Sequence, residues 1–331
     1  MRIGLIDVDG HNYPSLPLMK IAAWHRANGD DVEWHWNWGH YDKVYMSKVF
    51  DETYSKDVEP PLNADLIIKG GTGYFRRAKD GHAEVYVDGQ WLDNGDAASC
   101  NYGDVVYWER LPGEIEKAYP AYALYPDLTA NTAYGFLTRG CPNSCGFCMV
   151  SQKEGRCSLK VADLSQWWDG QGNIVLMDPN LLACREYMDL LRQLEESHAQ
   201  VDVNQGFDAR LLTPENIAAI RRIRIKDIHF AWDLMKNSQR IVKGLNLWKR
   251  YGKKDKHGSW GTVYVLVNFD TTMAENLFRI YKLRDMGFNP YVMVFDKPNA
   301  PREIRMLQRW CNNKKILKSC PRFEDYDPKK G

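Results

Sequence analysis

The chain has 331 residues, which is long enough to bury a sizeable core and to form two domains or one large one. Its formal net charge is only +1, so no global field attracts nucleic acid or an acidic substrate. The apolar runs are far shorter than the ~20 residues that span a bilayer, and the eight cysteines lack disulfide-framework spacing. These features exclude a membrane-spanning protein and predict a cytoplasmic one.

The first 75 residues alternate between strand-like and helical patterns. Residues 3–8 form an apolar run, and the apolar positions of 18–25 recur at helical spacing before Gly29. Further strands are expected at 32–38, where tryptophans alternate with polar residues, at 44–50 and at 64–69. This order of elements predicts a small Rossmann-like domain over residues 1–75.

Residues 76–128 are expected to form an insertion and a linker. Residues 85–92 alternate around Asp88-Gly89, a pair that favours the type I′ turn of a β-hairpin. A segment rich in proline and tyrosine at 111–128 then leads to the next domain.

Six strand-like runs alternate with helical patterns over residues 129–300. They lie at 133–137, 174–177, 201–204, 228–232, 263–269 and 291–295. Six β/α units predict a parallel sheet with helices outside it, and they are too few for a closed eight-stranded barrel. Residues 301–331 are expected to form a C-terminal helix and tail.

Three cysteines follow the first of these runs at C-x-x-x-C-x-x-C spacing: Cys141, Cys145 and Cys148. Three thiolates on one loop can bind three irons of a [4Fe–4S] cluster, whereas a typical electron-transfer cluster takes four cysteines. The fourth iron would then be open to a small molecule, as in catalytic metal sites. A zinc site or plain thiols are the alternatives, although no second cysteine pair follows at zinc-finger spacing.

This spacing resembles the signature of the radical S-adenosylmethionine (SAM) enzymes, and the six β/α units match the partial (β/α)6 TIM-like barrel of that family. The resemblance implies that the open iron binds the amino and carboxylate groups of SAM. It also implies that an electron from the cluster splits SAM into methionine and a 5′-deoxyadenosyl radical. Phe147 matches the family position that packs beside the adenine.

Ligands of parallel β/α folds bind at the carboxyl ends of the strands, so polar residues there are candidates for binding SAM. Asp178 and Asn180 follow the second run, where many family members carry a Gly-Gly-Glu motif for the amino group; that motif is absent here. Asp208 and Arg210 follow the third run and resemble a family position that holds the ribose or the carboxylate. An ordinary turn or cap is the alternative for each of them.

The N-terminal domain also resembles cobalamin-binding modules, which carry D-x-H-x-x-G, S-x-L and Gly-Gly in that order. The matching residues here are Asp9, His11, Ser47, Gly70 and Gly71. The resemblance implies a cobalt-ligating imidazole whose tautomer the aspartate fixes. Pro14 and Val49 depart from the pattern, and an ordinary turn is the alternative for His11.

These observations predict a radical SAM enzyme that uses a [4Fe–4S] cluster and SAM to modify an unknown substrate. A cobalamin-dependent radical SAM methyltransferase and a non-catalytic iron–sulfur electron-transfer protein are the alternatives. The expected partners are an external reductant such as flavodoxin or ferredoxin and a small-molecule, nucleoside or peptide substrate, with no membrane.

Two further features leave alternatives open. The basic stretch 240–256 contains Trp248 and Tyr251, so it could grip nucleic acid, but charge runs are more often solvated helix ends. An auxiliary cluster could use the remaining cysteines, of which Cys184 and Cys311 lie on apolar helix stripes and are expected to be buried thiols. The remaining five are Cys100, Cys157, Cys184, Cys311 and Cys320.

Overall fold

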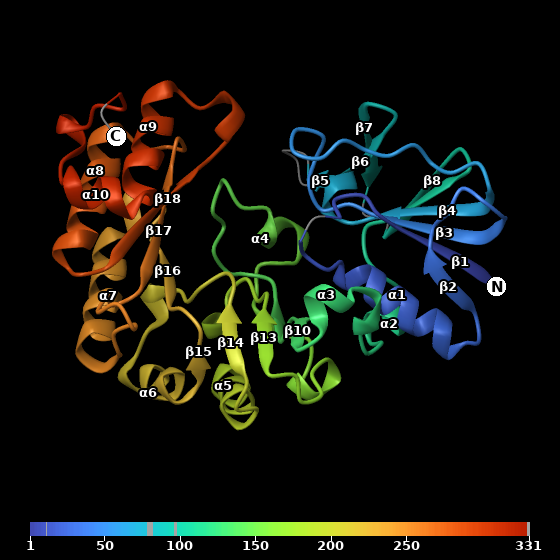
Figure 1. The fold of residues 1–331 in the computed structure, drawn as a ribbon, viewed down its shortest axis with the longest axis horizontal. Helices are drawn as coiled ribbons and strands as arrows, with labels where there is room; N and C mark the ends of the chain where they lie inside the picture. Colours follow the sequence, from blue (N-terminus) through green and yellow to red (C-terminus); the bar gives the residue numbers. More distant parts are fainter. Residues whose placement is uncertain (11, 78–81, 96–97, 330–331) are drawn as a thin grey trace. The chain divides into compact units, whose positions relative to one another are not determined.

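The computed structural model describes residues 1–10, 12–77, 82–95 and 98–329, and they form a mixed α/β structure with parallel sheets (Figure 1). The chain divides into two compact units. The first comprises Met1–Gly135 with two short later segments, Gln152–Glu154 and Leu164–Gln171, and the second comprises the rest. No helix among the described residues has both the length and the apolar character needed to cross a bilayer.

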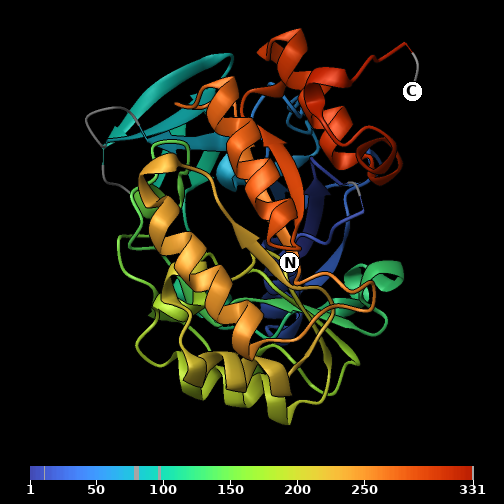
Figure 2. The ribbon, with the colours of Figure 1, turned by 90° about the vertical axis from the view of Figure 1, so that its left-hand side faces the viewer.

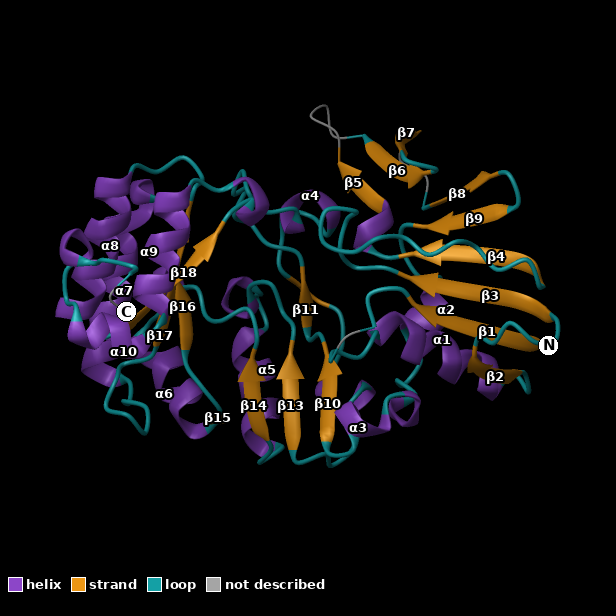
Figure 3. Ribbon diagram, turned by 45° about the horizontal axis from the view of Figure 1, so that its top comes forward, coloured by secondary structure: helices purple, strands orange, loops and turns teal. Residues whose placement is uncertain are grey.

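The first unit is built on a six-stranded sheet of order β2-β1-β3-β4-β9-β8 (Figure 3). Its strands are β1 (Arg2–Asp7), β2 (Asp31–Trp34), β3 (Tyr41–Ser47), β4 (Ala64–Gly70), β8 (Ser99–Tyr102) and β9 (Val105–Trp108). All neighbours are parallel except β8 and β9. The parallel strands run in the order β2-β1-β3-β4-β9, which confirms a parallel sheet in this part of the chain.

Helix α1 (Leu16–Ala27) packs against this sheet. Ser15 caps its N-terminus by accepting a hydrogen bond from the Leu18 N–H at 3.4 Å. At its other end His25 is completely buried, with its Nδ1 atom 2.6 Å from Asp30 and its Nε2 atom 2.9 Å from the Tyr45 hydroxyl. Burial lowers the pKa of His25, and Asp30 opposes this shift. The ring therefore ties the end of α1 to β3.

The strand predicted at 32–38 is shorter than expected. β2 ends at Trp34, and Trp36 and Trp38 are 64% and 85% exposed. The side-chain amide of Asn63 donates to the carbonyl oxygens of Trp36 and Gly39 at 3.1 and 2.9 Å, which holds this segment as a loop. The alternation of tryptophans was therefore a misleading signal beyond Trp34.

The insertion contains the predicted hairpin. An antiparallel sheet is formed by β5 (Phe75–Arg77), β6 (Ala83–Val87) and β7 (Gln90–Gly95). Asp88 and Gly89 both have positive φ, 47° and 86°, which is the backbone that a type I′ turn requires. The linker contains short helices α2 (Gly113–Glu116) and α3 (Pro126–Thr129), and β10 (Thr132–Gly135) ends the main segment of this unit.

The second unit contains two groups of parallel strands, with helices on one face (Figure 2). The first group is β13 (Asn173–Leu176), β14 (Gln200–Val203) and β15 (Arg224–Ile225), and the second is β16 (His229–Ala231), β17 (Thr262–Val267) and β18 (Asn289–Val294). A single parallel bridge, Phe207–Phe230, connects the groups. A short antiparallel pair, β11 (Thr138–Arg139) and β12 (Leu159–Lys160), flanks the cysteine segment.

Helices α5 (Tyr187–Glu196), α6 (Pro214–Arg222), α7 (Ser238–Tyr251) and α8 (Met273–Asp285) alternate with the parallel strands of this unit, as predicted. Helices α9 (Arg302–Asn312) and α10 (Lys314–Ser319) follow β18, and α4 (Val150–Lys153) lies between β11 and β12 in the sequence. The strands form no closed barrel among the described residues. The two-residue strands β11, β12 and β15 were not predicted, because so short a run has no measurable period.

Candidate functional site

The three cysteines lie on a loop that closes on itself, which we call the cysteine loop (residues 141–155). The N–H of Cys141 donates to the carbonyl oxygen of Gly155 at 3.1 Å, and the N–H of Cys148 donates to that of Cys145 at 3.0 Å. All three residues are half-buried and carry thiols rather than disulfides. Burial raises the pKa of Cys145, and Arg210 opposes this shift. The loop therefore presents three soft donors near a cation.

Asp178 accepts hydrogen bonds from the residues that precede this loop. It is 1% exposed, and its Oδ2 atom accepts from the N–H of Leu137 at 2.9 Å. Its Oδ1 atom accepts from the N–H and the hydroxyl of Thr138 at 2.5 and 2.6 Å. Burial raises the pKa of Asp178 to about 6, and these donors oppose the shift. The sequence suggested Asp178 for the amino group of SAM, but both oxygens are engaged by the chain itself.

We expect Asp178→Ala to lower the free energy of unfolding by about 2–6 kcal/mol, because it leaves two buried N–H groups without acceptors at about 1–3 kcal/mol each. Urea denaturation would measure this. Asp178→Asn should recover little, since the two N–H groups bond to different oxygens and an amide has only one. Asp227→Ala removes an exposed aspartate of the same unit and is the control. Equal stability of the Asp178→Ala and Asp227→Ala variants would contradict the anchoring role.

Asn180 connects the cysteine loop to the next strand end. Its Nδ2 atom lies 3.6 Å from the sulfur of Cys141 and 3.2 Å from Oδ2 of Asp208. Exchanging its nitrogen and oxygen would set two oxygens against each other at Asp208, so the amide orientation is well determined. The Oδ1 atom is buried and has no hydrogen-bond donor among the described residues. A buried acceptor without a hydrogen-bond donor costs free energy, so this oxygen is suited to a ligand that carries a donor group.

Asp208 and Arg210 form a bidentate ion pair at 2.8 and 2.7 Å. Their side chains are only 11% and 17% exposed. Burial would raise the pKa of Asp208, but the Arg210 guanidinium holds it below its usual value. Asn143 of the cysteine loop also donates to Asp208, at 3.1 Å. The predicted residues Asn180, Asp208 and Arg210 thus meet the cysteine loop in one hydrogen-bonded group.

Asp233 stands at the carboxyl end of β16. Burial raises the pKa of Asp233 to about 6, and the positive charge of Arg279 opposes this shift. Arg279 is fully buried and donates to the carbonyl oxygens of Trp232, Asp233 and Leu266 at 2.7, 2.6 and 2.8 Å. It therefore ties the ends of β16 and β17 together. Sequence reasoning missed Arg279, although a charge within the apolar stripe of α8 that contains Ile280 was a usable signal.

Phe147, the predicted neighbour of adenine, lies in a row of aromatic rings. Its ring meets that of Phe269 edge-on at 5.5 Å between centroids. Phe269 in turn meets Phe295 at 4.9 Å. The row connects the cysteine loop to the residues that follow β17 and β18.

Among the described residues, no group of three or more His, Cys, Asp or Glu side chains is gathered so that it could hold a metal ion. A zinc ion needs all its ligands around one point at about 2.0–2.3 Å, whereas each thiolate of a [4Fe–4S] cluster binds a different iron. The cluster therefore stays a prediction of the cysteine spacing. The donor chemistry fits it, because three half-buried thiols share one loop beside Arg210.

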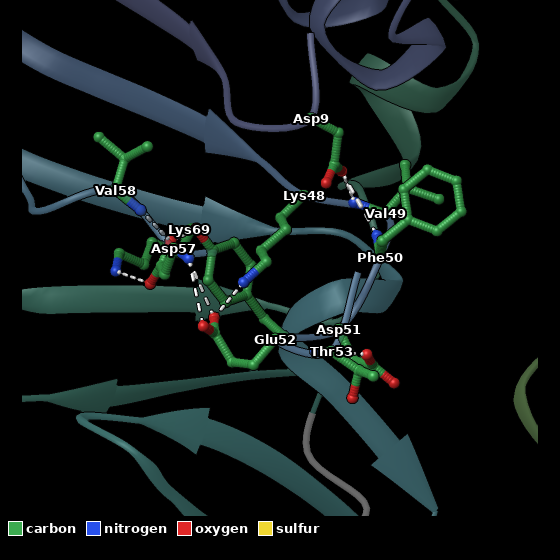
Figure 4. A network of polar contacts seen from close by, with 11 residues as sticks. Asp9, Lys48, Val49, Phe50, Asp51, Glu52, Thr53, Asp57, Val58 and Lys69 are labelled. Carbon is green, nitrogen blue, oxygen red and sulfur yellow. Dashed lines mark hydrogen bonds and ion pairs between the residues drawn. The ribbon is translucent and has the colours of Figure 1, made fainter. Parts of the chain in front are cut away.

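The described residues proposed for cobalamin contact other parts of the first unit, and Figure 4 shows the contacts of Asp9. The Oδ2 atom of Asp9 accepts hydrogen bonds from the N–H groups of Val49 and Phe50. The hydroxyl of Ser47 bonds to that of Ser15 at 3.1 Å. Asp9 therefore holds the segment that follows β3, and Ser47 connects the end of β3 to the N-cap of α1.

The two glycines of the set serve close packing of the backbone. Gly71 has a φ of 107°, and a side chain there would collide with the carbonyl oxygen of Lys48. The N–H of Lys48 donates to Gly70 at 3.0 Å, and the N–H of Gly73 donates to Lys48 at 2.9 Å. The chain after β3 thus lies against the end of β4.

Two buried lysines complete this arrangement (Figure 4). Lys48 pairs with Glu52, and Lys69 pairs with Asp57 at 2.7 Å; the lysines are 0% and 4% exposed. His11, the predicted cobalt ligand, lies outside the described residues. Cobalamin binding stays a prediction of the sequence, since the buried Oδ1 atom of Asp9 has no hydrogen-bond partner among the described residues.

The remaining predictions concern the basic stretch and the other cysteines. Trp248 of α7 is fully buried and its indole N–H donates to the carbonyl oxygen of Trp260, so it offers no stacking surface. The basic stretch 240–256 runs from within α7, which ends at Tyr251, into the residues that follow it. Cys184 and Cys311 are buried, as expected, and burial raises the pKa of Cys311 to about 12. Cys157 is exposed.

No protein-family model matches the chain, and no curated protein sequence matches it.

Proposed function

We propose that the chain is a radical SAM enzyme whose second unit binds a [4Fe–4S] cluster through Cys141, Cys145 and Cys148 and SAM beside it. The observation that supports this best is the buried Oδ1 atom of Asn180, an acceptor without a donor among the described residues, on a side chain that contacts Cys141. When bound, the cluster would supply the electron that splits SAM into methionine and a 5′-deoxyadenosyl radical.

The residues around the loop have separable roles in this proposal. Asp178 holds the base of the loop, and Asn143 and Asn180 join it to Asp208. The Oδ1 atom of Asn180 would accept from the ammonium of SAM. The Nε and Nη2 atoms of Arg210 donate to Asp208, and its Nη1 atom has no acceptor among the described residues. Nη1 is therefore suited to donate to a carboxylate or a ribose.

The wider architecture supports the same assignment. We infer that the two groups of parallel strands are parts of an open (β/α)6 TIM-like barrel with its ligands at the carboxyl ends of the strands. The edge-on rings of Phe147 and Phe269 would flank the adenine and exclude water. The substrate would be a small molecule, nucleoside or peptide, and the reductant a flavodoxin or ferredoxin.

Anaerobic reconstitution with iron and sulfide, followed by SAM and a chemical reductant, tests the proposal. We expect about four irons per chain and release of 5′-deoxyadenosine, detected by mass spectrometry. Cluster binding without SAM cleavage would instead indicate the electron-transfer alternative. Cobalamin-dependent methyl transfer stays a prediction of the sequence, and no step here depends on it.

A further inference from the structure

A basic groove lies on the second unit beside β18, α9 and α10, with a volume of about 740 Å³. Five of its lining residues are cations: Lys297, Arg305, Arg309, Lys314 and Lys315. No Asp or Glu is among the described residues that line it. In a chain whose net charge is only +1, this is a local concentration of positive charge.

Four of these cations are exposed and have no carboxylate partner in the part of the chain that is described: Lys297, Arg305, Lys314 and Lys315. Some surface cations elsewhere in this unit are paired, for example Arg222 with Glu195 at 2.8 Å and Lys226 with Asp202 at 3.0 Å. The nearest acid in the sequence, Asp296, accepts from the amide of Asn299 at 3.1 Å. The groove therefore suits a ligand with several negative charges.

The edge of β18 beside the groove is closed to another strand. The side chain of Asn312 accepts from the N–H of Val292 at 2.7 Å and donates to its carbonyl oxygen at 3.0 Å. Gln308 donates to the same carbonyl at 3.3 Å. These amides occupy the hydrogen-bonding groups that an added peptide strand would use, so β-strand addition of a protein partner is disfavoured.

The exposed face of β18 and of the residue after it is apolar and aromatic. Tyr291, Met293 and Phe295 alternate along one face and are 41%, 45% and 38% exposed. Tyr291 lines the groove, and Phe295 begins the row of rings that leads through Phe269 to Phe147. Cations beside aromatic faces are the pattern that binds a phosphate backbone and stacks its bases. A duplex hides the faces of its bases, so the pattern fits a single strand.

A lipid surface is the weaker fit. The apolar side chains of α9, which include Ile304, Leu307 and Trp310, are buried in the protein. The helix therefore has no apolar face to insert into a bilayer.

We propose that this groove binds single-stranded nucleic acid, with phosphates on the cations and bases on Tyr291 and Phe295, and that this strand is the substrate presented to the cysteine loop. The second part rests on the proposed function, whereas binding in the groove does not. Phe295 continues the exposed face that carries Tyr291, and the row of rings that it begins ends at Phe147, which precedes Cys148 in the sequence.

Fluorescence anisotropy with a labelled single strand of about 12 nucleotides, as RNA and as DNA, tests binding over a range of salt concentrations. The triple variant Arg305→Ala/Lys314→Ala/Lys315→Ala should bind at least tenfold more weakly. Its slope of log K against log salt should be smaller by about 2, because each lost phosphate contact removes about 0.7. Tyr291→Ala should bind about tenfold more weakly with an unchanged slope, because it removes stacking and no charge.

The matched control is Arg240→Ala/Lys243→Ala/Lys256→Ala, which removes three exposed cations of the same unit, from α7 and the segment after it. It should bind as the unmodified protein does. Equal weakening in both triple variants would overturn the groove assignment, and so would the absence of oligonucleotide binding. Binding of anionic phospholipid vesicles or of a polyglutamate peptide that the groove variant alone loses, with oligonucleotide binding unchanged, would overturn it in favour of that partner.

The binding assay needs neither iron nor SAM, so the two proposals fail separately. A protein that cleaves SAM but binds no oligonucleotide would overturn only the groove. A protein that binds the strand through the groove but never cleaves SAM would overturn the proposed function and with it the claim that the strand is a substrate.

Discussion

Replacing Cys141, Cys145 and Cys148 together by alanine is expected to abolish iron and sulfide binding and all release of 5′-deoxyadenosine. The three thiols share one loop closed by the Cys141–Gly155 hydrogen bond, so they are the donors best placed to act as a unit. Removing every protein ligand leaves no site for the cluster. Iron and sulfide assays after anaerobic reconstitution, with the absorbance spectrum, would measure the loss.

The chain offers a matched control for this variant. Cys100, Cys157 and Cys320 are three other cysteines that are not fully buried, and their triple alanine variant removes the same number of accessible thiols. It should load a normal cluster. Both variants should melt near the temperature of the unmodified protein, which would show that lost iron is not lost fold. About four irons retained without Cys141, Cys145 and Cys148 would move the ligands to the other five cysteines.

The sequence predicted the positions of the site better than its contacts. Asn180, Asp208 and Arg210 could be placed together because the carboxyl ends of parallel strands share one edge of a sheet. Their partners depend on how the intervening loops run. The path of residues 137–138, which delivers two N–H groups to Asp178, has no periodic pattern from which it could be read.

The prediction of strands from the sequence pattern has the same limit. β17 lies within the strand-like run predicted at 263–269, and Val263, Val265 and Val267 alternate on its fully buried face. The alternation of Trp36 and Trp38 is equally regular, yet both lie in a loop, since Asn63 binds the local carbonyl oxygens. An alternating sequence pattern indicates a strand only where the backbone N–H and C=O groups remain available to pair with a neighbouring strand.

Arg210→Ala is expected to weaken SAM binding about ten- to a hundredfold, because losing a charged hydrogen bond costs roughly 1.5–3 kcal/mol. The structure adds a complication. Arg210 also neutralises Asp208, which is only 11% exposed, so the variant leaves a carboxylate largely buried without its cation. Weaker binding in this variant alone would therefore not separate a contact to SAM from a disturbed Asp208.

The double variant Arg210→Ala/Asp208→Asn separates them. It removes the unpaired negative charge at position 208. The amide that replaces the carboxylate keeps one oxygen that can accept from the amides of Asn143 and Asn180. If Arg210 contacts SAM, the double variant should recover stability in urea but bind SAM as weakly as Arg210→Ala, by equilibrium dialysis with cluster-loaded protein. Asp208→Asn alone should bind SAM more tightly than either, since it retains the guanidinium. If the double variant instead regains full affinity, Arg210 acts only by holding Asp208, and the carboxylate of SAM must find its cation elsewhere.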